Sequence, residues 1–130
     1  MLAEILLELR NLKTKFKTYD GEVKAADGID LTVHKKEILG IVGESGCGKS
    51  ATALSIMRLI PSPPGEVHAD KMELNGVELQ SLTEKQLSKV RGSEVSMIFQ
   101  EPSSALNPAF TIGEQLIEVL ILHQKLDRGA

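Results

Sequence analysis

The stretch Gly43-Glu44-Ser45-Gly46-Cys47-Gly48-Lys49-Ser50 decides what kind of fold this sequence can form. It matches the phosphate-loop pattern G-x-x-x-x-G-K-[ST] at every fixed position. The residues before it, 37–42 (EILGIV), form a short apolar run that is typical of a strand buried on both faces. The residues after it, 50–60, carry apolar side chains at helical spacing. A strand, a glycine-rich loop and a helix in this order predict an anion-binding loop.

Each part of this loop has a physical role. Its glycines let successive backbone N–H groups point into one concavity, which favours an anion. The helix that follows adds the positive end of its dipole at the same place. The Lys49 ammonium can reach β- and γ-phosphates, and the Ser50 hydroxyl is an oxygen ligand that suits Mg²⁺. The expected nucleotide-binding residues of the loop are Gly43, Glu44, Ser45, Gly46, Cys47, Gly48, Lys49, Ser50 and Ala51.

A second pattern overlaps the first one. Residues 46–51 also read G-x-G-x-x-A, with Asp70 about 20 residues further on, as in a dinucleotide-binding loop. Such a loop should open where its strand stops, but three residues separate Gly46 from Val42. The Lys-Ser pair would also have no purpose there. The phosphate loop is the favoured interpretation, although kinases, GTPases, motor ATPases and transporter ATPases all share it.

Antiparallel strands are predicted on the N-terminal side of the loop. Residues 4–16 alternate leucines with polar residues, Asp20-Gly21 is a hairpin turn signal, and residues 23–33 form a second alternating run. Residues 66–79 predict two short strands around the turn Asn75-Gly76.

The pattern of the C-terminal part predicts two helices, one strand and a loop. A short helix should follow Ser81 or Thr83 and close at Gly92. Val95–Phe99 is expected to be another buried strand, and a proline-bearing loop should span 101–110. Thr111 and Glu114 form a capping box that should open a helix running to about Leu126. This helix has an apolar stripe wider than one core-facing side requires.

Composition limits the function classes. The chain has 130 residues, with 42% hydrophobic and 25% charged residues, which is typical of one globular domain. A formal charge of -3 argues against a general nucleic-acid binder, which needs a positive field. One cysteine excludes an intrachain disulfide. No apolar run approaches the length of a membrane span, and Glu4 stands where a signal peptide would want a base, so we expect a cytoplasmic protein.

A family resemblance follows from these motifs together. About forty residues with strand character precede the phosphate loop, and Met97–Pro102 (MIFQEP) leads into Ser103–Pro108 (SSALNP). With these features the sequence resembles the ATP-binding subunits of ABC transporters, in particular the dipeptide and oligopeptide importer group, which also contains nickel importers. The stretches that carry the resemblance are residues 12–14, 23–28, 37–50, 53–61 and 97–108, followed by 111–115 (TIGEQ).

The resemblance implies an α/β fold, with a P-loop NTPase core and an added antiparallel β layer. Residues 1–100 would form the β layer, phosphate loop and core, and residues 101–130 the Q-loop and the start of a helical subdomain. Lys49 and Gln100 would be catalytic, with Gln100 and Ser50 also serving Mg²⁺. Phe16 would stack on the adenine of ATP, with Tyr19 as the second candidate.

The resemblance also implies partners and a location. These are transmembrane permease subunits, a second ATPase subunit and, indirectly, a solute-binding protein, at the inner face of the cell membrane. No nucleic acid is expected.

The sequence departs heavily from the family pattern. It contains no segment like LSGGQ, no apolar strand ending in Asp-Glu and no switch histidine. We therefore expect an N-terminal piece of a longer ATPase, inactive by itself and prone to self-association. Two alternatives stay open: a P-loop nucleotide-binding regulatory module not involved in transport and, less favoured, a small-molecule P-loop kinase.

Overall fold

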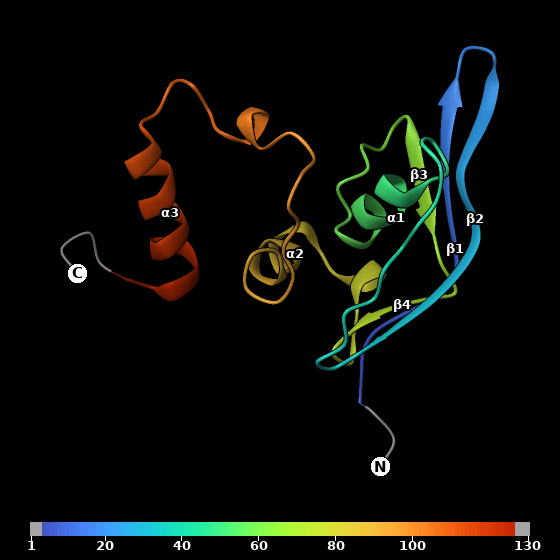
Figure 1. The fold of residues 1–130 in the computed structure, drawn as a ribbon, viewed down its shortest axis with the longest axis horizontal. Coiled ribbons are helices and arrows are strands. Elements are labelled where there is room, and N and C mark those ends of the chain that lie inside the picture. The colour runs from blue at the N-terminus through green and yellow to red at the C-terminus, as the bar shows by residue number, and fades with distance from the viewer. Residues whose placement is uncertain (1–3, 127–130) are drawn as a thin grey trace. The chain divides into compact units, whose positions relative to one another are not determined.

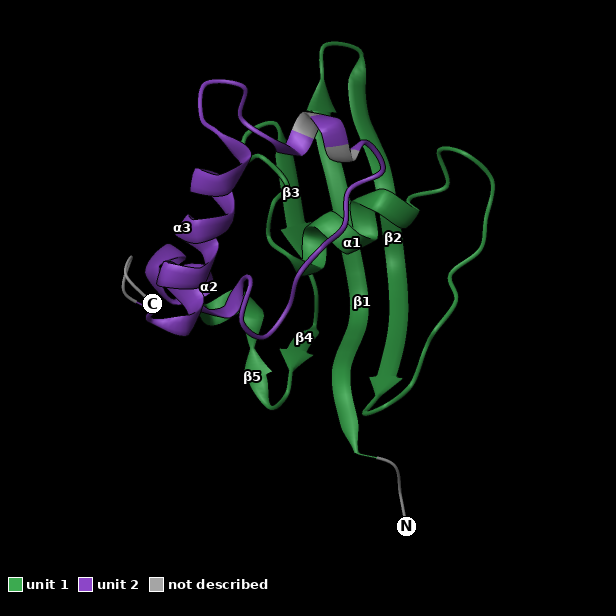
Figure 2. Cartoon of the chain, turned by 60° about the vertical axis from the view of Figure 1, so that its left-hand side comes forward, with its two compact units in different colours: residues 1–83 green, residues 84–130 purple. Residues whose placement is uncertain are grey.

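The computed structural model describes residues 4–126, and the chain divides into two compact units, residues 1–83 and 84–130 (Figure 2). The first unit holds the sheet, the glycine-rich loop and the first helix. The second holds the remaining α-helices.

A long antiparallel hairpin forms the frame of the first unit (Figure 1). Its strands are β1 (Ile5–Thr18) and β2 (Gly21–His34). Gly21 has a φ of 128°, a conformation that glycine adopts without strain, which explains the turn after Asp20. The register places Leu9 opposite Leu31 and Leu12 opposite Ile29. The sequence-based prediction of this hairpin is confirmed.

Three short strands complete the sheet. They are β3 (Gly65–His68), β4 (Lys71–Leu74) and β5 (Val77–Glu78). The sheet order is β2-β1-β4-β5, and β3 also pairs with β1, so that β1 lies at the centre. The predicted turn at Asn75-Gly76 is confirmed, because both residues have positive φ, 48° and 81°, as a tight hairpin between β4 and β5 requires.

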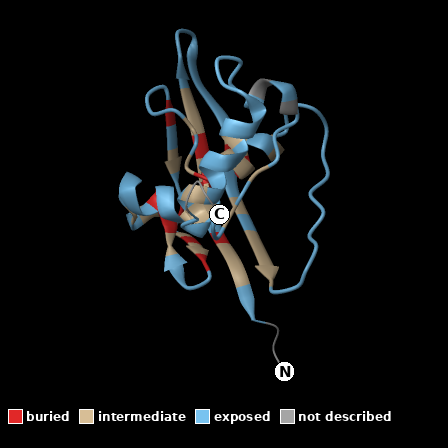
Figure 3. Cartoon of the chain, turned by 90° about the vertical axis from the view of Figure 1, so that its left-hand side faces the viewer, coloured by how far each residue is buried: buried red, intermediate tan, exposed pale blue. Residues whose placement is uncertain are grey.

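The core of this unit lies between the sheet and α1 (Lys49–Ile56), which packs against β1 and β2 (Figure 3). Leu9, Leu12 and Met72 of the sheet are fully buried. The short turn of 3₁₀ helix η1 (Leu79–Ser81) adds Leu79 to the same core. The helix ends earlier than the apolar pattern predicts: Met57 closes it, and Arg58 has a φ of 50°, outside the range of a right-handed helix.

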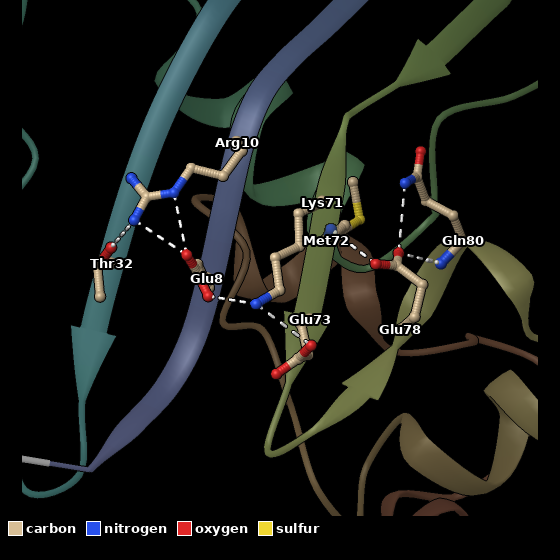
Figure 4. A network of polar contacts seen from close by, with 8 residues as sticks. All are labelled: Glu8, Arg10, Thr32, Lys71, Met72, Glu73, Glu78 and Gln80. Atoms are coloured by element: carbon tan, nitrogen blue, oxygen red, sulfur yellow. Dashed lines mark hydrogen bonds and ion pairs between the residues drawn. The ribbon is translucent and has the colours of Figure 1, made fainter.

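A network of polar side chains lies on strands β2, β1, β4 and β5 of the sheet (Figure 4). The Glu8 carboxylate accepts a hydrogen bond from Arg10 Nε at 3.0 Å and from Lys71 Nζ at 2.5 Å, which links β1 to β4. The hydrogen bond from Lys71 is the main reason why the pKa of Glu8 lies below its usual value. On the same side Glu78 accepts from the backbone N–H of Met72 at 3.1 Å. These contacts favour one register of β4 on β1.

The expectation of a buried strand at residues 37–42 is wrong. Within the described part of the chain these residues form no strand, and Ile38 is 100% and Val42 94% exposed. A strand needs neighbours for its ladder hydrogen bonds and cover for its faces. Residues 4–126 supply neither at this position, so the segment runs as coil from β2 to α1 (Figure 2). The glycine-rich loop and α1 are therefore formed without a strand directly before the loop among the described residues.

The expectation of a strand at Val95–Phe99 is also wrong. Only one isolated bridge, between Arg91 and Val95, forms there, and Ile98 is 95% exposed. The physical reason is the same: no second strand of the second unit lies beside this run among the described residues.

The helices of the second unit agree better with the sequence. They are α2 (Glu84–Val90), the 3₁₀ turn η2 (Pro102–Ala105) in the expected loop, and α3 (Ile112–Gln124). The capping box is confirmed: Glu114 N donates to Thr111 Oγ1 at 3.2 Å, and Thr111 N donates to Glu114 Oε2 at 3.0 Å. Gly92 has a φ of 88°, as expected for the residue that closes α2. No described residue of α3 is buried, so its wide apolar stripe is uncovered.

One buried hydrogen bond ties α1 to the sheet. Thr14 of β1 and Ser55 of α1 are both fully buried, and their hydroxyl oxygens lie 2.7 Å apart. Ser55 Oγ donates its only proton to Ala51 O at 2.6 Å. Thr14 must therefore be the donor to Ser55.

We predict that Ser55→Ala destabilises the fold more than Thr14→Val. Ser55→Ala leaves the buried Thr14 hydroxyl without its partner, which costs about 1–3 kcal/mol, whereas Thr14→Val removes the donor and costs about 1 kcal/mol. Urea unfolding of both variants and of the double variant gives a double-mutant cycle. Strictly additive costs would contradict the direct bond.

Candidate functional site

The glycine-rich loop leads directly into α1. Gly46 and Gly48 have φ of 81° and 92°, so both adopt the left-handed backbone that glycine accepts most readily. Gly48 is the N-cap of α1, and no side chain caps the helix there. The first backbone N–H groups of α1 therefore have no side-chain partner at the cap and face the loop, as an anion site at a helix N-terminus requires.

Gly48 also touches the sheet. A Cβ atom at this position would lie 2.0 Å from Ala25 O in β2, which no side chain could tolerate. The glycine thus lets the start of α1 rest on the backbone of β2. This contact and the Thr14–Ser55 bond hold the two ends of α1 on neighbouring strands.

Lys49 folds back over the loop. Its Nζ donates to Gly43 O at 2.6 Å, to Glu44 O at 2.7 Å and to Cys47 Sγ at 3.3 Å. The positive charge therefore lies at the loop itself, where phosphate would bind. These carbonyl partners are neutral, so a phosphate oxygen would be a stronger partner for the ammonium.

Cys47 packs against Gly43 at the start of the loop. A Cβ atom on Gly43 would lie 2.5 Å from Cys47 Sγ, so the thiol packs across this glycine. Cys47 is nevertheless exposed. The loop is thus folded on itself through one thiol and one ammonium.

Ser50 and Ala51 occupy the first turn of α1. Ser50 is exposed, and its hydroxyl is the hard oxygen donor that Mg²⁺ prefers. The chemistry of this residue therefore fits the expected metal ligand. Within residues 4–126 no group of three or more His, Cys, Asp or Glu residues could hold a metal ion by itself. Any Mg²⁺ here would depend on Ser50 together with phosphate oxygens and water.

Gln100 lies in the second unit. It follows the partly exposed run 95–99, precedes η2 and is itself exposed. Its role beside Mg²⁺ and water stays a prediction.

The two aromatic candidates differ in exposure. Phe16 is half-buried in β1, opposite Val23 on one side and Gly65 on the other. Its ring packs on Gly65, where a Cβ atom would lie 3.3 Å from Phe16 Cε1. Tyr19 is fully exposed in the hairpin turn. Stacking of either ring on adenine stays a prediction.

Sequence reasoning missed the contacts that position the loop. The Thr14–Ser55 bond joins residues 41 positions apart, and nothing in either local pattern indicates it. The Gly48–Ala25 contact has only a weak sequence signal. The phosphate-loop pattern requires glycine at position 48, but it does not indicate which backbone segment that glycine approaches.

Known proteins resemble this chain over most of its length. Residues 26–129 match the ABC transporter family. The chain is 47% identical over 125 residues to the oligopeptide transport ATP-binding protein OppD of Bacillus subtilis (strain 168), covering 96% of this chain and 35% of that protein. It is 42% identical over 127 residues to the dipeptide transport ATP-binding protein DppD of the same organism, covering 98% of this chain and 38% of that protein.

A third relative comes from another genus. The oligopeptide transport ATP-binding protein OppD of Salmonella typhimurium is 43% identical over 127 residues, covering 98% of this chain and 37% of that protein. The chain thus spans somewhat more than a third of the length of these curated relatives. No helix within residues 4–126 has the length and apolar character needed to cross a bilayer. A family match over most of the chain and relatives above 40% identity lead to one conclusion: the chain belongs to the ABC transporter family.

Proposed function

We propose that this chain is the nucleotide-binding part of an ATPase that powers peptide uptake through an ABC-type transporter. The observation that carries the proposal is the loop 43–50, with the Lys49 ammonium at its carbonyls and Gly48 seated on β2. The peptide substrate rests on the names of the relatives, which are oligopeptide and dipeptide transport ATP-binding proteins. The same names disfavour a regulatory module without a role in transport.

ATP binding follows from the loop's own groups. The N–H groups at the start of α1 would donate to phosphate oxygens, supported by the helix dipole. Lys49 Nζ would exchange Gly43 O and Glu44 O for β- and γ-phosphate oxygens. Mg²⁺, when bound, would neutralise charge that develops on the phosphates, and the Ser50 hydroxyl would hold it.

Two further residues complete the proposed site. Gln100 would orient the attacking water, which a side-chain amide can do by hydrogen bonding. Phe16 would stack on adenine, with exposed Tyr19 as the alternative. Residues 1–100 would then carry ATP, and residues 101–130 would begin the part that senses the permease.

The proposed partners are transmembrane permease subunits and a second ATPase subunit, with a solute-binding protein acting indirectly. The chain would lie at the cytoplasmic face of the membrane, held there by the permease. The partners are proposed from the transport function in the relatives' names.

We also propose that the 130-residue chain binds ATP without turning it over. The phosphate loop is local, within eight consecutive residues, whereas the 130 residues contain no LSGGQ-like segment and no apolar strand ending in Asp-Glu. The glutamate of that absent Asp-Glu strand would act on the attacking water together with Gln100, and its loss would forfeit part of an orientation effect worth roughly 7–11 kcal/mol. Phosphate release by the purified chain at rates typical of transporter ATPases would contradict this.

We predict that Lys49→Ala weakens ATP binding at least about tenfold, because charge-assisted hydrogen bonds contribute roughly 1.5–3 kcal/mol. Isothermal titration of the 130-residue chain measures the affinity. Lys85→Ala is the matched control, since Lys85 is an exposed lysine of α2 outside the loop and should change little. Equal ATP affinities of the Lys49 variant and the parent chain would contradict the phosphate-loop assignment.

We predict that ATP with Mg²⁺ protects Cys47 from a bulky maleimide. The thiol is exposed, is the single cysteine of the chain and packs across Gly43, so bound phosphates should displace or cover it. The labelling rate is followed by mass spectrometry with and without nucleotide. In Lys49→Ala the protection should be lost at the same ATP concentration. Labelling that proceeds equally fast with saturating nucleotide would place the phosphates elsewhere.

A further inference from the structure

The two buried residues of α1 are both polar. Thr52 is 4% exposed and Ser55 is 0% exposed. The buried face of a short surface helix is usually apolar, and a hydroxyl in a helix competes for the helix's own hydrogen-bonding groups. The described residues of the first unit bury these hydroxyls by themselves, so their burial is a property of this part of the chain.

Each hydroxyl donates to the carbonyl four residues before it. Thr52 Oγ1 donates to Gly48 O at 2.9 Å, and Ser55 Oγ donates to Ala51 O at 2.6 Å. Gly48 O also accepts the backbone N–H of Thr52, at 2.9 Å. The Gly48 carbonyl and the Lys49 N–H belong to one peptide unit, and a first-turn N–H has no acceptor within its own helix. Thr52 therefore binds the far end of the peptide unit whose N–H lies at the phosphate loop.

These bonds join into one continuous chain that starts in the sheet. Its first link is the buried contact of 2.7 Å between the hydroxyl oxygens of β1 and α1. Two hydroxyl groups and two peptide units then follow one another, each donating to the next. In order, the chain runs through Thr14, Ser55, Ala51, Thr52, Gly48 and Lys49. A hydrogen bond onto a carbonyl polarises the peptide unit, so that its N–H becomes a stronger donor.

We propose that Thr52 and Ser55 are positioning residues of the phosphate site. Their hydroxyls hold and polarise the two peptide units that lead to the Lys49 N–H, which would donate to phosphate. The inference rests on the proposed function, because it concerns the same phosphate site. Thr52 acts on the Gly48–Lys49 peptide directly, and Ser55 acts through one more peptide unit.

The geometry of Gly48 gives Thr52 a second effect. Gly48 has a φ of 92°, and glycine has more backbone freedom than any other residue. The hydroxyl and the N–H of Thr52 both hold its carbonyl, which fixes the orientation of the peptide unit that carries the Lys49 N–H. Cooperative strengthening is roughly 10–30% per hydrogen bond, so we expect severalfold changes in affinity and not larger ones.

Calorimetric titration of the 130-residue chain with pyrophosphate tests the inference. Thr52→Val keeps the side-chain shape and removes the hydroxyl, and its dissociation constant should rise about threefold. Thr52→Ser keeps the hydroxyl and should bind like the parent chain. Ser55→Ala, which acts one peptide unit further away, should raise the dissociation constant about twofold.

Leu9→Val is the matched control. Leu9 is fully buried in β1, so the change destabilises the core of the same unit but leaves the chain of hydrogen bonds intact. The affinity of the folded Leu9 variant should equal that of the parent chain. All titrations are made at a temperature at which circular dichroism shows each variant to be folded. Should Thr52→Val fail to fold, Thr52→Ala takes its place in the comparison with Thr52→Ser.

Chemical shifts of the ligand-free chain give a second readout, which loss of stability alone does not move. The carbonyl ¹³C shift of Gly48 and the amide ¹H shift of Lys49 both report on the bond from Thr52. Both should move upfield in Thr52→Val and stay in place in Thr52→Ser, because only the first variant loses the hydroxyl.

The outcomes separate this inference from the proposed function. Equal pyrophosphate affinities of Thr52→Val and a parent chain that binds would overturn the inference and leave the phosphate site in place. Equal losses in Thr52→Val and Thr52→Ser would also overturn it, because they would assign Thr52 to packing alone. A parent chain that binds no pyrophosphate would overturn the proposed function, and this inference with it.

Discussion

The attachment of α1 to the sheet is the constraint on which the rest of the first unit depends. One end of the helix is held by the buried Thr14–Ser55 hydrogen bond, and the other begins at Gly48 on the backbone of Ala25. Because both contacts are close and each joins defined atoms of α1 and the sheet, α1 has little freedom to slide along β1 and β2. The direction of its N-terminus is therefore set by the hairpin, and the loop before it must bend to meet that end.

This arrangement supports the proposed anion site. The two contacts hold α1 on the sheet, and the glycines of the loop lie directly before its first turn. The resting state of the loop is held by Lys49 on Gly43 and Glu44, through two neutral carbonyls. Replacing these carbonyls by phosphate oxygens would pair the Lys49 ammonium with an opposite charge instead of with neutral acceptors, so we expect a phosphate to compete well for Lys49.

The sequence predicts what is local and misses what is not. The turns at Gly21 and Asn75-Gly76 and the capping box at Thr111 each depend on a few adjacent residues, and all are formed. The phosphate loop is likewise a contiguous pattern. The runs 37–42 and 95–99 signal burial through composition, yet a strand also needs a partner that composition does not supply. The described residues contain no such partner, so the first run is exposed and the second is exposed in part. Nothing in the sequence pattern indicates tertiary contacts such as the Thr14–Ser55 hydrogen bond.

The central claim is that residues 43–51 form the phosphate-binding site of an ABC-type nucleotide-binding domain. Backbone amide chemical shifts of the isotope-labelled chain, followed during a titration with pyrophosphate, test it most directly. The account predicts saturable shifts concentrated at Gly46, Gly48, Lys49 and Ser50, with smaller ones at Ala25 of β2, which Gly48 touches. Saturable shifts confined to other segments, or no shifts at all, would contradict it.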